Sequence, residues 1–146
     1  RLSTPTVHLE STLNTADIDS WLGQLSPGAP AADAPLQTPK GECWLLSQLK
    51  GDFTLLYFTD GAVPEDVEAE LRRLSENAVL VKPLVIGLNS ESQGVSLFDL
   101  LGLAALRYDA RNGTTYLLRP DQHISARWKR FAKDAVRKAL KRATCN

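Results

Sequence analysis

The chain has 146 residues, 43% of them hydrophobic, and its 17 Lys and Arg balance its 17 Asp and Glu. This length suits one domain, and a domain of about 150 residues buries about 68–70% of its unfolded surface. No apolar run approaches the roughly 20 residues that cross a bilayer, and the start lacks the apolar core of a signal peptide. These features predict a cytoplasmic globular protein without a membrane partner. The absence of Met predicts a fragment or a processed form.

Charge is distributed unevenly along the chain. Residues 111–146 hold ten Lys and Arg against two Asp and Glu, whereas residues 1–110 hold seven against fifteen. Most of the positive excess falls on the last predicted helix, where cations complement the C-terminal end of the helix dipole. We expect a solvated helix face, or one that lies against an acidic surface. A nucleic-acid patch is the alternative, and the lack of an interleaved aromatic platform argues against it.

The chain divides near residue 40. Residues 1–40 contain turn-forming and extended segments, and Pro27, Pro30, Pro35 and Pro39 deny them helix and ladder donors. So long a stretch with little regular structure is uncommon inside a compact domain unless it is functional or a linker. We therefore predict an extended, loop-rich segment over 1–40 and a folded domain over 41–146. Apolar side chains in the first part should pack on this domain or on a neighbouring one: Leu9, Leu13, Ile18, Trp21 and Leu25.

The first half of the domain reads as helix, strand, helix, strand. Residues 43–49 predict a short helix with Trp44, Leu45 and Leu49 inward. Residues 53–58 form a near-continuous apolar run, which is typical of a strand buried on both faces. Pro64 and the acidic residues after it favour a helix start, and apolar spacing carries that helix to residue 74. Residues 81–88 predict a second buried strand.

The second half ends in a hairpin and a helix. Ser96 to Asp99 resembles a capping box and predicts a short buried helix over 97–103. Residues 114–119 and 123–128 predict antiparallel strands joined by a tight turn at 119–122. Ile124, Ala126 and Trp128 should share one face of the second strand. The last helix should turn an apolar stripe inward: Phe131, Ala135, Val136, Ala139 and Leu140.

The hairpin also carries a family resemblance. Leu-Leu-Arg-Pro-Asp at 117–121, followed by His123 and by Ala-Arg-Trp at 126–128, resembles the C-terminal domain of FAD-dependent aromatic monooxygenases of the phenol-hydroxylase and hydroxyphenylpropionate-hydroxylase type. The resemblance extends back through 107–111, 53–58 and 27–35, so it covers nearly the whole chain. Its motif residues are Arg107, Tyr108, Asp109, Arg119, Pro120, Asp121, Arg127 and Trp128.

The resemblance implies an α/β, thioredoxin-like fold, with a central mixed sheet, flanking helices and a C-terminal β-hairpin plus helix. In that family the domain follows the FAD and substrate domains, carries no flavin chemistry, and has roles in structural support and subunit contact. Residues 1–40 would then be a linker from the flavin and substrate domains. The parent enzyme would use FAD and NAD(P)H to insert oxygen into a phenolic ring. This chain would bind no cofactor, and its partners would be those domains or a second subunit.

Thioredoxin chemistry is not expected. Redox-active members place a cysteine pair after the first core strand, at a helix N-terminus that lowers the thiol pKa. Here that stretch, 59–64, reads Thr-Asp-Gly-Ala-Val-Pro and holds no sulfur. The place of the proline that active members hold before the third core strand reads Asn-Gly-Thr at 112–114. A flavin-binding G-x-G-x-x-G turn is absent as well.

Two other readings of the chain stay open. A free-standing thiol enzyme would use Cys43, since residues 27–30 resemble the opening segment of peroxiredoxins, but the apolar neighbours of Cys43 predict an inert thiol. A disulfide to Cys145 is disfavoured in a reducing compartment. The third reading is a stand-alone interaction module that uses the basic last helix to hold acidic protein or nucleic acid.

Two side-chain constellations invite a catalytic reading that we do not favour. Asp121, His123 and Ser125 could suggest a triad, yet one exposed hairpin offers no oxyanion pocket. The two histidines, His8 and His123, are too few for a metal site. For the motif residues we expect a structural role first: Asp109 or Asp121 pairs with Arg119 or Arg127, and Trp128 fills the core. Contact with a partner domain is the alternative.

Overall fold

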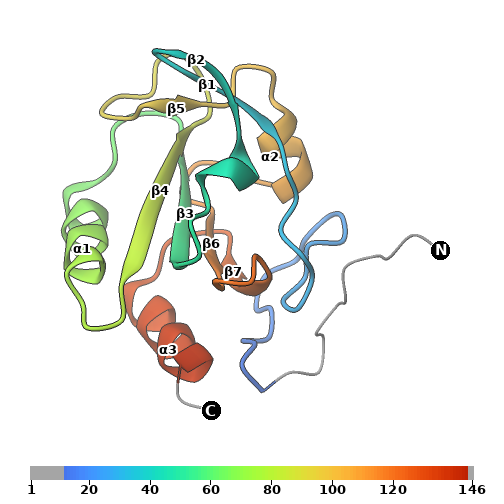
Figure 1. The fold of residues 1–146 in the computed structure, drawn as a ribbon, viewed down its shortest axis with the longest axis vertical. Helices are drawn as coiled ribbons and strands as arrows, with labels where there is room; N and C mark the ends of the chain where they lie inside the picture. Colours follow the sequence, from blue (N-terminus) through green and yellow to red (C-terminus); the bar gives the residue numbers. More distant parts are fainter. Residues whose placement is uncertain (1–11, 145–146) are drawn as a thin grey trace.

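The computed structural model describes residues 12–144, which form a seven-stranded mixed sheet with helices on both faces (Figure 1). The strand order across the sheet is β2-β1-β5-β4-β3-β6-β7. The strands are β1 (Pro35–Thr38), β2 (Gly41–Trp44), β3 (Phe53–Thr59), β4 (Val81–Gly87), β5 (Leu97–Phe98), β6 (Thr115–Leu118) and β7 (Ile124–Trp128). The helices are α1 (Glu65–Ser75), α2 (Leu103–Tyr108) and α3 (Lys133–Thr144), with a 3-10 turn, η1 (Leu45–Gln48).

The predicted core order is confirmed at the centre of the sheet. β3 pairs in parallel with β4 over seven residues and antiparallel with β6. A parallel pair needs a crossover, and α1 supplies it. Pro64 sits at the start of α1, with Glu65, Asp66 and Glu68 in the first turn, where the helix dipole favours anions. Six of the seven residues of β3 are buried, as the apolar run predicts.

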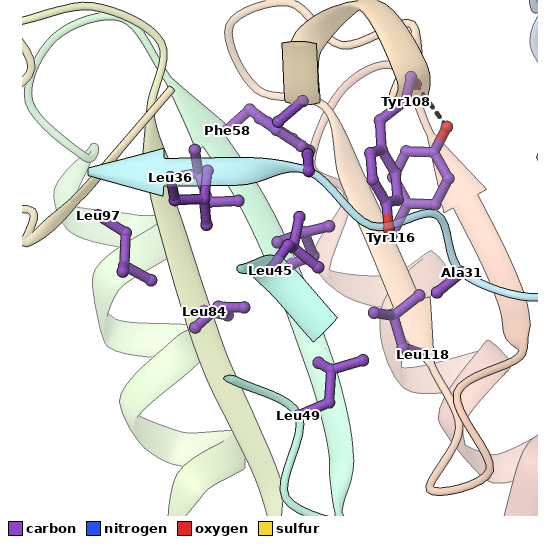
Figure 2. Packing of buried hydrophobic residues seen from close by; sticks show 14 of the residues in the cluster. Ala31, Leu36, Leu45, Leu49, Phe58, Leu84, Leu97, Tyr108, Tyr116 and Leu118 are labelled. Atoms are coloured by element: carbon purple, nitrogen blue, oxygen red, sulfur yellow. Dashed lines mark hydrogen bonds between the residues drawn. The ribbon is translucent and has the colours of Figure 1, made fainter. Parts of the chain in front are cut away.

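The two faces of the sheet have separate cores. Val67, Leu71 and Leu74 of α1 and the inner stripe of α3 pack on one face, together with Trp128. The other face is covered by α2, η1 and residues N-terminal to β1. Figure 2 shows this second core, where Tyr108 of α2 stacks edge-on against Tyr116 of β6, with ring centroids 5.0 Å apart. Of the inward stripe predicted for the last helix, Val136, Ala139 and Leu140 are buried and Ala135 is partly buried. Phe131 packs on the same core but lies before the helix begins at Lys133.

The region before β3 differs from the predicted helix over 43–49. Residues 41–44 form strand β2, which pairs antiparallel with β1, and only one 3-10 turn follows. Leu45 and Leu49 are buried as predicted, but Trp44 points outward and is 55% exposed. A short apolar run can form either a strand or a helix. Residues 41–44 form a strand because they pair with β1. The expected boundary at residue 40 falls in the turn of this hairpin.

The helix predicted over 97–103 is also wrong. Leu97 and Phe98 form the short strand β5, and the helix begins only at Leu103. Asp99 does cap it, since its two carboxylate oxygens accept the backbone N–H groups of Ala104 and Ala105 at 3.0 and 2.8 Å. Asp99 is therefore a capping residue, as the sequence suggested. The helix begins only at Leu103, because Gly102, with φ of 73°, adopts a left-handed conformation before it.

The C-terminal hairpin forms as predicted, with one change of face. The turn closes through the N–H of Gln122, which donates to the carbonyl oxygen of Arg119 at 2.9 Å. Leu117 lies opposite Ala126, but Leu118 lies opposite Ile124, so Ser125 is the extra residue of a bulge. Ile124 therefore packs in the core on the α2 face, whereas Ala126 and Trp128 pack under α3. The prediction that all three share a face is wrong for this reason.

Gly87 provides a test of packing where β4 meets β5. A Cβ at this position would lie 2.8 Å from the Cβ of Ser92 and 3.0 Å from a ring carbon of Phe98. We expect Gly87→Ala to lower the free energy of unfolding by about 1–3 kcal/mol, the usual cost of overpacking. Urea denaturation measures it. Gly61→Ala is the matched control, since a Cβ there meets nothing within 4 Å. Equal stability of the two variants would contradict the prediction.

No helix within residues 12–144 is long and apolar enough to cross a membrane. Leu9, whose packing was predicted, lies outside the described residues, as do His8 and Cys145.

Candidate functional site

An extended segment, residues 13–30, runs beside the edge strand β7, and we call it the strap. Its first end is fixed where the N–H of Thr15 donates to the carbonyl of Ser125 at 2.9 Å and the Ser125 hydroxyl donates to the carbonyl of Leu13 at 3.2 Å. Its second end is fixed where Gly28 and Ala29 exchange backbone hydrogen bonds with Ile124. The strap thus covers a sheet edge that would otherwise offer unpaired backbone groups.

Arg127 of β7 is the principal anchor of the strap. Its guanidinium makes a bidentate ion pair with Asp17, with Nη2 to Oδ2 at 2.8 Å and Nε to Oδ1 at 3.0 Å. The Arg127 side chain is only 4% exposed and that of Asp17 is 25% exposed. The guanidinium carbon also lies 4.3 Å from the centre of the Trp21 ring. Burial would lower the pKa of Arg127, but hydrogen bonds to Asp17 and Tyr116 outweigh it and raise the pKa.

Lys129, two residues after Arg127, forms a second anchor. Its backbone N–H donates to Asp19 at 2.8 Å, and its ammonium pairs with Asp109 at 2.7 Å. The ammonium nitrogen also lies 4.2 Å from the Trp21 ring centre, so this indole contacts two cations. Asp109 in turn accepts the N–H of Leu22 at 2.8 Å. That bond, and then the one from Lys129, hold the pKa of Asp109 below its usual value.

Arg107 and Tyr108 attach α2 to the chain that follows the strap. Arg107 donates to the carbonyl of Asp33 at 2.8 Å, and the Tyr108 hydroxyl donates to the carbonyl of Ala32. Tyr116 completes the connection, because its hydroxyl donates to the carbonyl of Tyr108 at 2.5 Å (Figure 2). Burial raises the pKa of Tyr108 above its ordinary range and that of Tyr116 to about 12, so both stay protonated donors.

The turn residues of the motif act locally. Arg119 pairs with Asp121 at 2.7 Å, as predicted, and Pro120 is exposed at the corner. His123 contacts the backbone oxygen and, at 3.5 Å, the carboxylate of Asp121. Ser125 is fully buried and its hydroxyl bonds to Leu13, so Asp121, His123 and Ser125 do not assemble as a triad. Trp128 fills the core at 3% exposure, as predicted.

The structure therefore gives the motif residues a common role. Arg107, Tyr108, Asp109 and Arg127 hold residues 17–33 against the domain. The turn residues hold the hairpin, and Trp128 fills the core. Arg127 pairs with Asp17, rather than with Asp109 or Asp121 as the sequence suggested, and Asp109 pairs with Lys129. Sequence reasoning missed Asp17, Asp19 and Lys129, and it missed the contacts of Trp21 with two cations. The acidic first part and basic last part of the chain gave a signal, but not the partners.

Ile18 behaves differently from its neighbours in the strap. Trp21 and Leu25 pack against the core beneath α2, as predicted. Ile18 was expected to pack as well, but it is 79% exposed. Asp17 and Asp19 on either side both bond inward to β7 and to Lys129, so the side chain between them points away from the domain.

Residues 59–64 connect β3 to α1, the place at which redox-active thioredoxins carry their cysteines. Here the Asp60 N–H donates to the side-chain oxygen of Asn112 at 3.0 Å, and the Thr59 hydroxyl bonds Gly61 at 3.2 Å. The loop is thus held by polar side chains from the two segments that would flank a redox pair. It contains no nucleophilic sulfur, and nothing in its composition supports thiol exchange.

Cys43 lies elsewhere, on the outer strand β2, where it is partly buried. Burial raises the pKa of its thiol, and a hydrogen bond with Gln48 offsets this only in part. A reactive cysteine needs the opposite shift, because the thiolate is the nucleophile. Cys145, to which a disulfide was not expected, lies outside the described residues.

Two common signatures of dinucleotide and metal binding are not found within residues 12–144. The β3-to-α1 connection has a single glycine, whereas a dinucleotide fold needs a glycine-rich turn there. Within residues 12–144, no three His, Cys, Asp or Glu side chains gather as metal ligands would.

A hollow of about 290 Å³, near β1 and β5, is lined by Gln37, Thr38, Pro39, Ser90, Phe98 and Leu100.

Comparison with known proteins yields structural matches only. No family model matches the chain, and no curated protein matches it. The flavin-dependent monooxygenase PieE, solved with FAD and substrate, is 20% identical with a TM-score of 0.67. Aklavinone-11 hydroxylase, solved with FAD and aklavinone, is 20% identical with a TM-score of 0.72. These matches cover 92% and 94% of this chain, which spans about a quarter of theirs, 24% and 26%.

Smaller proteins match as well. A putative thiol:disulfide interchange protein, DsbE from Chlorobium tepidum, is 17% identical with a TM-score of 0.62, over 82% of this chain and 99% of its own. A pneumococcal lipoprotein thioredoxin from Streptococcus pneumoniae is 19% identical with a TM-score of 0.54, over 75% and 98%. Together with the β3-α1-β4-α2-β6-β7-α3 order, these likenesses confirm the predicted fold: the chain is an α/β protein of the thioredoxin-like type.

Proposed function

We propose that this chain is the C-terminal, redox-inactive thioredoxin-like domain of an FAD-dependent aromatic ring hydroxylase, and that its own role is structural. It docks on the flavin and substrate domains of the same polypeptide or supports contact between two subunits. The parent reaction is insertion of oxygen into a phenolic ring with FAD and NAD(P)H. No step of that reaction is assigned to a residue of this chain.

The extent of the structural matches carries the proposal. The two flavin monooxygenases match 92–94% of this chain, whereas the two thioredoxin-like proteins match 75–82% of it. Outside the central sheet and helices, the strap is a long segment that is bonded to β7 along its course. Among the residues that resemble the hydroxylase family, Arg107, Asp109 and Arg127 use their hydrogen bonds to hold residues 17–33 in place. A domain organised to fix the chain that leads into it suits a module within a larger protein.

A free-standing thiol enzyme is the second candidate, because the small redox proteins match over nearly their whole length. The sulfur-free loop over 59–64 and the raised pKa of Cys43 argue against it. The interaction module is a third candidate. Arg137 on the basic helix α3 pairs with Glu70 of α1. This pair fits the expectation of a helix face that lies against an acidic surface, but that surface belongs to the chain itself.

Two measurements test the proposal. First, the coding sequence upstream of Arg1 should encode a flavin-binding domain, and the full protein should show flavin absorbance and oxidise NAD(P)H with a phenolic substrate. Second, this chain alone should not reduce insulin disulfides, and its rate of peroxide consumption should equal that of Cys43→Ser. A start codon immediately upstream would overturn the proposal in favour of a free-standing protein. Peroxide consumption that Cys43→Ser abolishes would overturn it in favour of the thiol enzyme.

A further inference from the structure

Three highly exposed apolar side chains belong to the layer formed by the strap and α2. Ile18, Leu22 and Leu106 expose 79%, 78% and 75% of their surface. Single exposed hydrophobic residues are common on protein surfaces. These three differ because each lies next to an ion-paired aspartate: Ile18 follows Asp17, the N–H of Leu22 bonds to Asp109, and Leu106 accepts the N–H of Asp109. We call this set, Ile18, Leu22 and Leu106, the strap face.

The bonds around the strap face fix its backbone. Ile18 stands between the two aspartates that pair with β7 and with Lys129. The N–H of Leu22 is bonded to Asp109, and the N–H of Asp109 in turn bonds to the carbonyl of Leu106 at 3.4 Å. Ordering costs reduce the affinity of flexible surfaces, so apolar groups that are already fixed can bind with little further loss of entropy.

The charges near the strap face are matched. Asp17 pairs with Arg127, and Asp109 pairs with Lys129, so each of these two cations has its own carboxylate. Asp19 beside Ile18 and Arg107 beside Leu106 bond only to backbone groups, and their opposite charges balance, so the charged groups named here sum to zero. Burying such exposed leucine and isoleucine side chains under an apolar surface lowers the free energy of the system.

The path of the chain points to one occupant. The strap is continuous with residues 1–11, so the polypeptide that precedes it reaches the domain at Leu13, five residues before Ile18. Whatever is joined there is held close, which raises its effective concentration at this surface. The monooxygenases that match this chain are about four times its length, so in them most of the polypeptide lies outside the matched part.

We infer that the strap face is the docking surface for the flavin and substrate domains of the same polypeptide. This inference rests on the proposed function and deepens it by naming the surface. The partner surface is apolar and uncharged, and the strap orients the domain by carrying the docking side chains on a rigid ionic frame.

The test uses the full-length hydroxylase with a protease site placed within residues 1–11. After cleavage, size-exclusion chromatography and flavin absorbance report whether this domain stays with the flavin portion. We expect the unsubstituted protein to stay associated, and Ile18→Ser/Leu22→Ser/Leu106→Ser to weaken association at least tenfold. The matched control is Trp44→Ser/Leu100→Ser/Leu101→Ser, which removes three side chains that are 54–66% exposed near β2 and β5. The control should stay associated. Equal urea midpoints for the two triple variants show that both are folded.

Each other outcome contradicts the inference in a recognisable way. If the strap-face variant stays associated, or if only the control separates, another surface docks. If the strap-face variant turns a dimer into a monomer but keeps the flavin portion, the occupant is a second copy. If the full-length protein has no flavin domain, the proposed function fails and the inference fails with it. Flavin present together with unchanged association overturns the inference alone.

Discussion

Asp17→Asn is expected to lower the free energy of unfolding by about 3 kcal/mol, because it leaves a buried guanidinium without its counter-charge. The Arg127 side chain is 4% exposed, and its Nε and Nη2 both donate to the Asp17 carboxylate. Buried ion pairs contribute little over apolar replacements, yet removal of one partner is costly since the other charge stays desolvated. Urea denaturation of the chain at neutral pH measures the effect.

The control for this variant is Glu68→Gln, which neutralises a carboxylate paired with Arg72 at 3.4 Å on the surface of α1. Both of those side chains are 64% exposed, so the expected change is within about 0.5 kcal/mol. Adding Arg127→Met to Asp17→Asn should restore part of the lost stability, because it removes the unpaired charge itself. If Asp17→Asn were as stable as the control, the Asp17–Arg127 ion pair would not anchor the strap.

Hydrogen exchange gives a local measure of the same prediction. In Asp17→Asn the amides of Thr15 and Leu22, which bond to Ser125 and Asp109, should exchange faster as the strap opens. Amides of β3, at the centre of the sheet, should change only through the global stability. Local opening at lower free energy than global unfolding is the usual behaviour of an edge segment. Unchanged protection at Thr15 would mean that the strap is held without Asp17.

The parts of the fold that the sequence predicted are those with a local signal. The apolar run of β3 and the start of α1 at Pro64 depend on neighbours in sequence, and both were placed within a residue. The hairpin turn was equally readable from Arg119 to Gln122. The α1 stripe at 67, 71 and 74 fixed which face is inward. Periodicity and turn chemistry are strong enough to locate such elements.

The missed parts depend on distant partners. Asp17 and Arg127 are 110 positions apart, and no local pattern pairs one aspartate with one arginine over that distance. The segment at 41–44 became a strand because β1 lies beside it, and the helix expected at 97 waits for the left-handed turn at Gly102. Ile124 changed face through a one-residue bulge, because a one-residue shift exchanges the two faces of a strand.

The site shows the same division. Arg107, Tyr108, Asp109 and Arg127 were singled out from the family resemblance, and all four proved to make specific contacts. Their partners on the strap could not be named, since backbone oxygens such as those of Ala32 and Asp33 leave no trace in residue type. Charge asymmetry pointed to acid–base contact between the two parts of the chain, but it could not distinguish Asp17 from the other acidic residues.

Glu70→Gln is expected to lower the free energy of unfolding at pH 7 by about 3 kcal/mol. The Glu70 side chain is 3% exposed and joins α1 to α3, with Arg73 Nη2 at 2.9 Å and Arg137 Nη2 at 2.8 Å. Burial alone would raise the pKa of Glu70, but hydrogen bonds from Arg137 and Arg73 outweigh it and bring the pKa to about 2, from an ordinary value of 4.5.

The sign of the pH dependence follows from that shift. A carboxyl whose pKa is lower in the folded state stabilises the fold above its unfolded pKa, and the stabilisation is lost as pH falls through the folded pKa. The contribution of Glu70 should therefore be complete above pH 4.5 and should decline between pH 4.5 and about 2. Urea denaturation across this range should give a flatter curve for Glu70→Gln than for the unsubstituted chain.

Glu68→Gln again serves as the control, because it removes a carboxylate from the same helix but from its exposed side. Its curve should run nearly parallel to that of the unsubstituted chain. If Glu70→Gln also kept the full slope between pH 4.5 and 2, another group would carry the acid sensitivity. The ion pairs of Glu70 would then be replaceable by neutral hydrogen bonds, and the basic face of α3 would be free to take an acidic partner without loss of stability.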